Sequence, residues 1–146
     1  MDHWFPPVAF HFRVGFDLPG FSEKDARFQE VTGLSVELGV EELVEGGENR
    51  FIHRLPTRPK YGNLILKRGF LDDSDLAQWL KDGIENFQFT PVDVLVTLLN
   101  EEHEPLAGWS YVGAWPVKWA VSDLKAQENT LVIETLELSY KYFRRI

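Results

Sequence analysis

The sequence predicts a mainly β protein: a barrel or sandwich of about seven or eight antiparallel strands with one α-helix. Apolar residues alternate with polar or small ones along residues 8–18 and 130–143, a period typical of strands with one buried face. One segment, residues 71–87, instead has apolar residues at helical spacing. The Gly- and Pro-containing stretches 18–25 and 45–49 are expected to be loops between strands.

The early strands follow from alternation. In residues 8–18 one face is apolar from Val8 to Leu18, so we expect that face to pack in the core and the other face to contact solvent. Residues 36–40 continue the pattern with apolar side chains at every second position. The doubled Glu41-Glu42 then breaks the phase, as a bulge or a strand end would.

The later strands differ in how they are covered. Apart from Asp93 and Thr97, residues 92–99 are apolar on both faces, which predicts a central strand covered on both sides. Residues 115–121 form a strand in which Pro116 is expected at the start or at an edge. In residues 130–143 the even positions form one face, with Glu134 as its only charged residue.

The helix is predicted over about residues 73–85. Its apolar stripe consists of Leu76, Trp79, Leu80 and Ile84. Acidic side chains favour a helix N-terminus, and three of them occur there: Asp72, Asp73 and Asp75. We expect this helix to pack over one opening of the sheet. Among the five tryptophans, we expect three in the core and leave Trp4 and Trp109 unassigned; the three are Trp79, Trp115 and Trp119.

Size and composition limit the number of domains and the classes of protein to which the chain can belong. With 146 residues and 44% hydrophobic residues, the chain has enough apolar mass for one core, so residues 1–146 are expected to be a single domain. A net charge of −8 argues against coating nucleic acid. The start lacks a signal-peptide pattern and no apolar run reaches the ~18 residues of a membrane span, so we expect synthesis and assembly in the cytoplasm. No cysteine is present, which excludes disulfides and leaves the redox compartment undetermined.

The middle of the chain carries two neighbouring blocks of opposite charge. Residues 28–49 contain six acids and no Lys or Arg, and residues 50–68 contain six bases and no acid. One interpretation is a hairpin whose two strands neutralise each other around the turn at 45–49. The other is a head-to-tail contact between copies of the chain, acidic patch to basic patch, which closes into a ring or continues as a filament. Phosphate binding by the basic block lacks a supporting glycine loop.

Catalytic and metal-binding patterns are missing from the sequence. The four histidines form no HExxH motif, and no serine lies in GxSxG. The acidic stretch 101–104 is expected to be a solvated turn. We therefore predict a protein that is not an enzyme and has no catalytic residues, no metal site and no cofactor. A carbohydrate-binding β-sandwich and a lipocalin-like container remain as distant alternatives.

Five segments together resemble one family. They are "FQEVTGL" (28–34), "EGGENRFIHRLP" (45–56), "KYGNLILKRGF" (60–70), "AWPVKW" (114–119) and "IETLELSYKYF" (133–143). In this order and spacing the chain resembles the tail-tube proteins of contractile phages and phage-tail-like contractile injection systems, over roughly residues 8–143. The amino-acid sequence of residues 39–56 and 133–143 is most similar to the baseplate-proximal tube-initiator type.

The resemblance implies a structural role. It implies homo-hexameric rings whose sheets join into a β-lined channel, and rings that stack inside a contractile sheath. Partners would be other tube rings, the sheath, and baseplate or spike proteins, with possible cargo in the lumen, in a secretion particle that is extracellular or docked to a membrane. The bulk shaft tube protein of such a system or of a phage tail is the alternative, and a ring of a type VI secretion system is the nearest rival.

The charged middle segment corresponds to the family's extended loop, which reaches across subunits or rings. We expect its charged residues in those contacts: Glu41, Glu42, Glu45, Arg50, Arg54, Arg58 and Lys60. We further expect Lys67 and Arg68 to end a strand at the ring's rim and to face carboxylates of an adjacent subunit, with Gly69 allowing a close approach or a bulge.

Overall fold

A computed structural model describes residues 11–19, 27–44, 46–47, 52–70, 75–124 and 131–146. Within these ranges the chain is mainly β with one helix, as predicted. The strands are β1 (His11–Phe16), β2 (Arg27–Phe28), β3 (Glu30–Thr32), β4 (Val36–Leu43), β5 (His53–Tyr61), β6 (Leu64–Gly69), β7 (Val92–Leu99), β8 (Pro105–Val121), β9 (Ile133–Ser139) and β10 (Tyr142–Arg145), and the helix is α1 (Asp75–Ile84).

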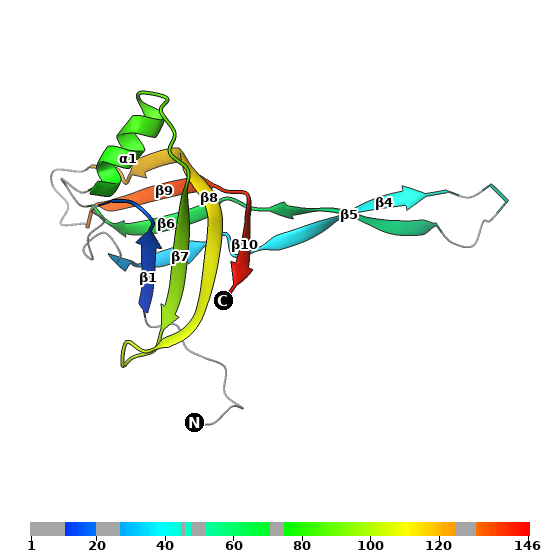
Figure 1. The fold of residues 1–146 in the computed structure, drawn as a ribbon, viewed down its shortest axis with the longest axis horizontal. Helices are drawn as coiled ribbons and strands as arrows, with labels where there is room; N and C mark the ends of the chain where they lie inside the picture. The colour runs from blue at the N-terminus through cyan, green and yellow to red at the C-terminus, as the bar shows by residue number, and fades with distance from the viewer. Residues whose placement is uncertain (1–10, 20–26, 45, 48–51, 71–74, 125–130) are drawn as a thin grey trace.

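The main sheet is antiparallel and closes on itself. Its strand order is β2-β1-β7-β8-β9-β6-β3, with β10 beside β8. Only Gln29 separates β2 from β3, so one short segment pairs with β1 at one end of the order and with β6 at the other. The backbone N–H of Gln29 donates to the carbonyl of Lys67 at 2.8 Å. The result is a barrel (Figure 1).

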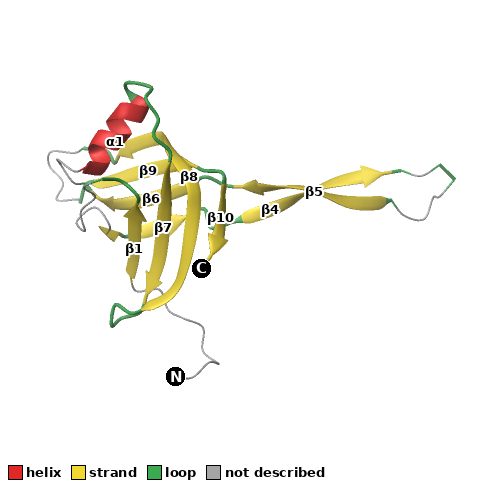
Figure 2. Ribbon diagram, in the orientation of Figure 1, coloured by secondary structure: helices red, strands yellow, loops and turns green. Residues whose placement is uncertain are grey.

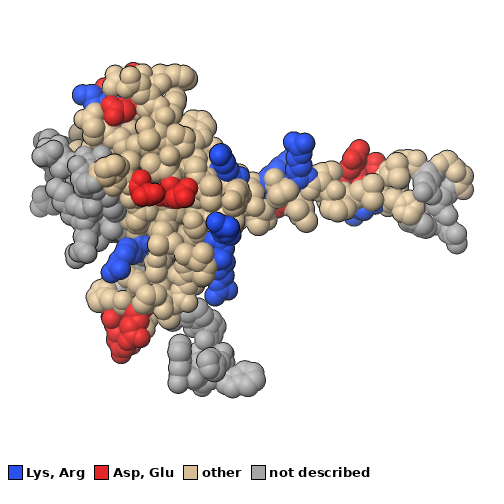
Figure 3. Space-filling model, in the orientation of Figure 1, with Lys and Arg blue, Asp and Glu red and all other residues tan. Residues whose placement is uncertain are grey.

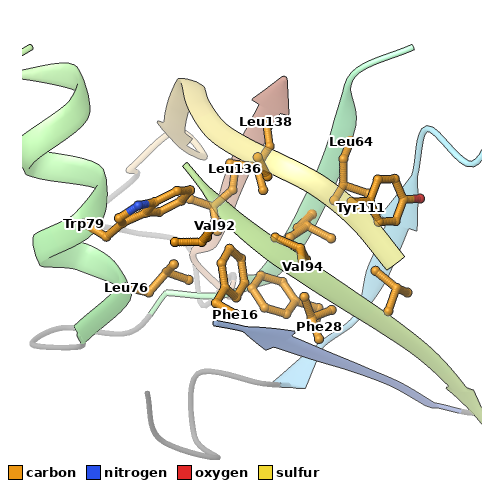
Figure 4. Close-up of a cluster of buried hydrophobic side chains, with 14 of the residues drawn as sticks. Phe16, Phe28, Leu64, Leu76, Trp79, Val92, Val94, Tyr111, Leu136 and Leu138 are labelled. Carbon is orange, nitrogen blue, oxygen red and sulfur yellow. The ribbon is translucent and has the colours of Figure 1, made fainter. Parts of the chain in front are cut away.

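The barrel interior holds the core, to which alternate residues of each strand contribute. Along β6 and β9 every second side chain is buried, because successive side chains point to opposite faces of a strand. Figure 4 shows core side chains from several strands gathered between the strands and α1, which stands at the left. The fully buried apolar residues are Val14, Leu64, Leu66, Leu76, Val94, Val96, Tyr111, Ala114, Leu136 and Leu138.

Helix α1 covers one opening of the barrel, as expected. Leu76, Trp79 and Leu80 are buried. The Trp79 indole packs edge-on against Phe16, with ring centres 5.7 Å apart, and its N–H donates to the carbonyl of Thr90 at 2.8 Å. Asp72 and Asp73, expected at the start of this helix, lie outside the described residues.

Strands β4 and β5 form a separate two-stranded sheet, here called the arm. It projects away from the barrel (Figures 1 and 2). Val36, Leu38 and Val40 are therefore 51%, 59% and 63% exposed. The expected break at Glu41-Glu42 is wrong: β4 continues to Leu43, and the register shift lies between Leu38 and Val40.

Three expectations about coverage need correction. Strand β7 is central, since it pairs with both β1 and β8, but the described residues do not fully cover its second face, on which Leu95 is 41% exposed. Trp115 and Trp119 are 37% and 44% exposed and lie outside the core, whereas Trp79 is buried as predicted. Pro116 is buried in the middle of the 17-residue strand β8, beside a register shift, and does not start it.

Candidate assembly interface

The arm presents both blocks of charge on one hairpin. In register, Glu37 lies opposite Lys60 and Glu42 lies opposite Arg54. These four side chains are exposed, as are Glu41 and Arg58, and Figure 3 shows both signs of charge along the arm. The hairpin geometry is confirmed. Contacts of these residues with another subunit stay a prediction, and Glu45 and Arg50 lie outside the described residues.

One face of the arm is apolar in its part next to the barrel and continues farther out with the charged pair Glu42 and Arg54. The register places Val36, Leu38 and Val40 opposite Tyr61, Pro59 and Pro56, and directly opposed residues share a face of a sheet. Both prolines are exposed. Soluble monomers seldom expose a continuous apolar surface of this kind without a binding role. This surface was missed in the sequence because alternation in residues 36–40 was attributed to the core.

Arg68 does not lie on the surface. Its side chain is 2% exposed, and its Nε donates to the Glu134 carboxylate at 3.1 Å. The other oxygen of Glu134 accepts from the Trp119 indole N–H at 2.8 Å. The Arg68 guanidinium carbon also lies 5.0 Å from the centre of the Phe28 ring. The expectation that Arg68 faces a neighbouring subunit is wrong, because it shares the buried face of β6 with Leu64 and carries its own counter-ion.

Lys67 and Gly69 lie on the other face of β6. The Lys67 side chain is 42% exposed, and its Nζ lies 3.7 Å from the Glu30 carboxylate of the same chain. A contact of Lys67 with a neighbouring subunit stays a prediction. Gly69 pairs in register with Ile133, and a Cβ placed there would meet no atom within 4 Å. Within the chain there is therefore no close approach at Gly69, and an approach by a neighbouring subunit stays a prediction.

The acidic stretch after β7 is an exposed turn. The Asn100 side-chain oxygen accepts from the backbone N–H groups of Glu102 and Glu104, both at 2.9 Å. A hydrogen bond with Glu102, reinforced by that residue's charge, raises the pKa of the Glu104 carboxyl. Among the described residues, no three His, Asp or Glu side chains are arranged to hold a metal ion. In the same part of the chain, no helix has the length and apolar character needed to cross a membrane.

Comparison with known proteins places this geometry in a family. The sequence pattern of the family described as T4-like virus tail tube protein gp19 matches residues 8–144. The chain belongs to this tail tube family. It is 33% identical to a chain in the cryo-EM structure of the anti-feeding prophage (AFP) baseplate, 6-fold symmetrised, with a TM-score of 0.85 and coverage of 97% of this chain and 96% of that one.

More distant structures share the fold of this tail tube protein. A chain of the PVC sheath-tube complex, from an extracellular contractile injection system, is 22% identical, with a TM-score of 0.81 and coverage of 99% and 93%. A type six secretion system protein is 12% identical, with a TM-score of 0.62 and coverage of 94% and 83%. Among proteins with curated functions, none matches in sequence. The family is structural rather than enzymatic, which agrees with the prediction from the sequence.

Proposed function

We propose that this tail tube protein forms homo-hexameric rings that stack into a β-lined inner tube, and that its ring is the baseplate-proximal initiator. One observation carries the initiator assignment. The chain is 33% identical to a relative in a six-fold symmetrised baseplate structure, against 22% for a chain of a sheath-tube complex and 20% for a chain of a tube-terminating cap. The partners are then neighbouring copies, the first shaft ring, the sheath and the baseplate or spike.

The barrel and the arm supply surfaces that a ring needs. Strand β10 pairs only with β8 among the described strands, so its outer edge offers unpaired backbone groups. An exposed strand edge is a template for pairing with another chain. The arm adds an exposed apolar surface next to the barrel and exposed charges of both signs. A ring uses two different patches of each subunit in a head-to-tail contact, and surfaces of opposite charge on one hairpin suit that arrangement.

Charge swapping separates the two interpretations of the arm. The double variant Glu42→Arg/Arg54→Glu keeps an opposite-charge pair across the hairpin but reverses the field presented to a neighbour. If the acidic patch of one arm meets the basic patch of the next, the variant still forms rings with itself, because every copy carries the swap, but it fails to form mixed rings with the parent chain. If these charges only neutralise each other within the hairpin, the variant and the parent mix freely in one ring, and the interface proposal fails for this pair.

The same logic applies at the barrel surface. Lys67→Glu is expected to weaken ring formation while leaving the circular dichroism spectrum unchanged, because exposed charges affect association more than stability. Lys81→Glu, on the exposed side of α1, is the matched control. Equal ring formation by all three proteins would remove Lys67 from the interface.

Labelling distinguishes the initiator from a shaft ring. The protein, tagged with gold, is mixed with the purified shaft tube protein of the same system and imaged by negative stain. The initiator proposal predicts label at one end of each tube, whereas label along the whole length would identify a shaft protein. A monomer whose tryptophan fluorescence changes on addition of glycans would instead favour the carbohydrate-binding alternative.

A further inference from the structure

We propose that Tyr140 is a positioning residue that sets the direction of the arm relative to the barrel. Its hydroxyl donates a hydrogen bond of 2.7 Å to the backbone carbonyl of Gly62. Gly62 lies in the two-residue connection between β5 and β6, where the arm joins the barrel. Only the consequence for ring assembly rests on the proposed function, because the direction of the arm is a property of the single chain.

The arm is joined to the barrel at two places. One is residues 33–35, between β3 and β4, and the other is residues 62–63, between β5 and β6. Both connections are short, and they touch. Gly33 has a positive φ of 100° and lies so close to the carbonyl of Asn63 that a Cβ would overlap it. A change in the arm's direction must therefore alter the backbone at both places together, and the carbonyl held by Tyr140 is in one of them.

Aromatic rings continue this attachment into the core. The ring of Tyr61, the last residue of the arm, packs edge-on against Tyr140 and Phe143, with centres 5.9 and 5.3 Å apart. Tyr140 in turn packs edge-on against Tyr111 at 4.8 Å, and Tyr111 is fully buried in the barrel. An unbroken series of rings thus connects the base of the arm to the core.

A second hydrogen bond supports the same connection. The Asn63 side-chain amide donates to the Glu137 carboxylate of β9 at 3.1 Å. Tyr140 directly follows β9, so β9 and the residue after it hold both residues of the connection. Burial, reinforced by the neighbouring Tyr61, raises the pKa of Tyr140 to about 12. The hydroxyl therefore keeps its proton and remains a donor throughout the physiological pH range.

The test measures the direction of the arm directly. The chain has no cysteine, so Val44→Cys, directly after the outer end of β4, and Lys81→Cys on α1 provide unique sites for spin labels. Distances are measured by pulsed electron resonance, with labelled chains diluted in unlabelled chains so that only distances within one chain contribute. Tyr140→Phe, which removes only the hydroxyl, is expected to broaden the distance distribution. Tyr142→Phe, the same change at an exposed position of β10, is expected to leave it unchanged.

Hydrogen exchange gives a second measure. Loss of one net hydrogen bond predicts amide exchange in the arm connection that is faster by about twofold to tenfold in Tyr140→Phe. A distribution as narrow as the parent's in Tyr140→Phe, or equal broadening by Tyr142→Phe, would overturn the proposal. If the distribution broadens but the parent forms no rings, the positioning role stands and the proposed ring function fails. If the parent forms rings and Tyr140→Phe needs a higher concentration to do so, both stand.

Discussion

Replacing Glu134 by leucine tests the buried ion pair between Arg68 and Glu134. The sequence alone did not predict this pair. In the parent chain the Glu134 carboxylate accepts from Arg68 at 3.1 Å and from Trp119 at 2.8 Å. Glu134→Leu removes the charge that lies against the guanidinium of a side chain only 2% exposed. Breaking a buried pair from one side costs about 3–5 kcal/mol, because the remaining buried charge loses this counter-ion.

The expected loss is large for a chain of this size. About 4 kcal/mol is a substantial part of the roughly 5–15 kcal/mol that stabilises a domain. At about 2–4 °C per kcal/mol, the melting temperature should fall by about 8–16 °C. The double variant Arg68→Met/Glu134→Leu removes both charges and fills similar volume, so its stability should return to within about 1 kcal/mol of the parent. Part of the remaining difference in stability comes from the lost contact between the Arg68 guanidinium and the Phe28 ring.

The free energy of unfolding is measured in urea by tryptophan fluorescence and circular dichroism for the parent, for Arg68→Met, for Glu134→Leu and for the double variant. These four values make up a double-mutant cycle. The matched control is Glu30→Leu, which breaks the exposed pair with Lys67 on the opposite face of β6 and should cost at most about 1 kcal/mol. If Glu134→Leu costs no more than Glu30→Leu, or if the double variant is as unstable as the single one, the account of a buried pair is wrong.

Three further changes have defined outcomes. The hydroxyl of Tyr111 is buried without a hydrogen-bond partner among the described residues, so Tyr111→Phe should leave the free energy of unfolding unchanged or raise it by up to about 1 kcal/mol; a clear loss would show a missed partner. Gly33→Ala should destabilise by about 2 kcal/mol or more in a urea titration, because φ is 100° and the new Cβ would overlap the Asn63 carbonyl. Gly69→Ala, where a Cβ meets nothing within 4 Å, is its control, and equal effects would contradict the argument. Finally, burial raises the pKa of Tyr140 to about 12 from the usual 10.0, so its stabilising effect is complete below pH 10 and is lost as the pH rises toward 12. Alkaline unfolding of Tyr140→Phe should lack that contribution, and curves identical to the parent's would argue against it.

Much of the fold was predictable from local pattern. Alternation identified β1, β4 and β9, but it did not identify β5 or the part of β8 between Pro105 and Ala114. The stripe of Leu76, Trp79 and Leu80 identified the helix and its packing over the barrel. The same rule was wrong at Val36, Leu38 and Val40, because alternation shows that one face is apolar and does not show whether the same chain or another covers it. The pattern could not distinguish an arm from a core strand.

The candidate site was predictable only in part. The charge blocks correctly suggested a hairpin, but Arg68 was placed at the surface with its neighbour Lys67. Two signals could have corrected this. Arg68 shares the parity of Leu64 and Leu66 on β6, and Glu134 is the single acid on the apolar face of β9. Two opposite charges, each alone on a buried face, predict a partnership once the register is known, and register depends on contacts far apart in sequence.

The most direct test of the central claim is the mass of the purified protein by light scattering over a range of concentrations, with negative-stain images of the same fractions. The account predicts rings of about 100 kDa, six copies of a 16.9 kDa chain, or short tubes built from them. A monomer at every concentration, including in the presence of preformed shaft tubes as a template, would contradict it.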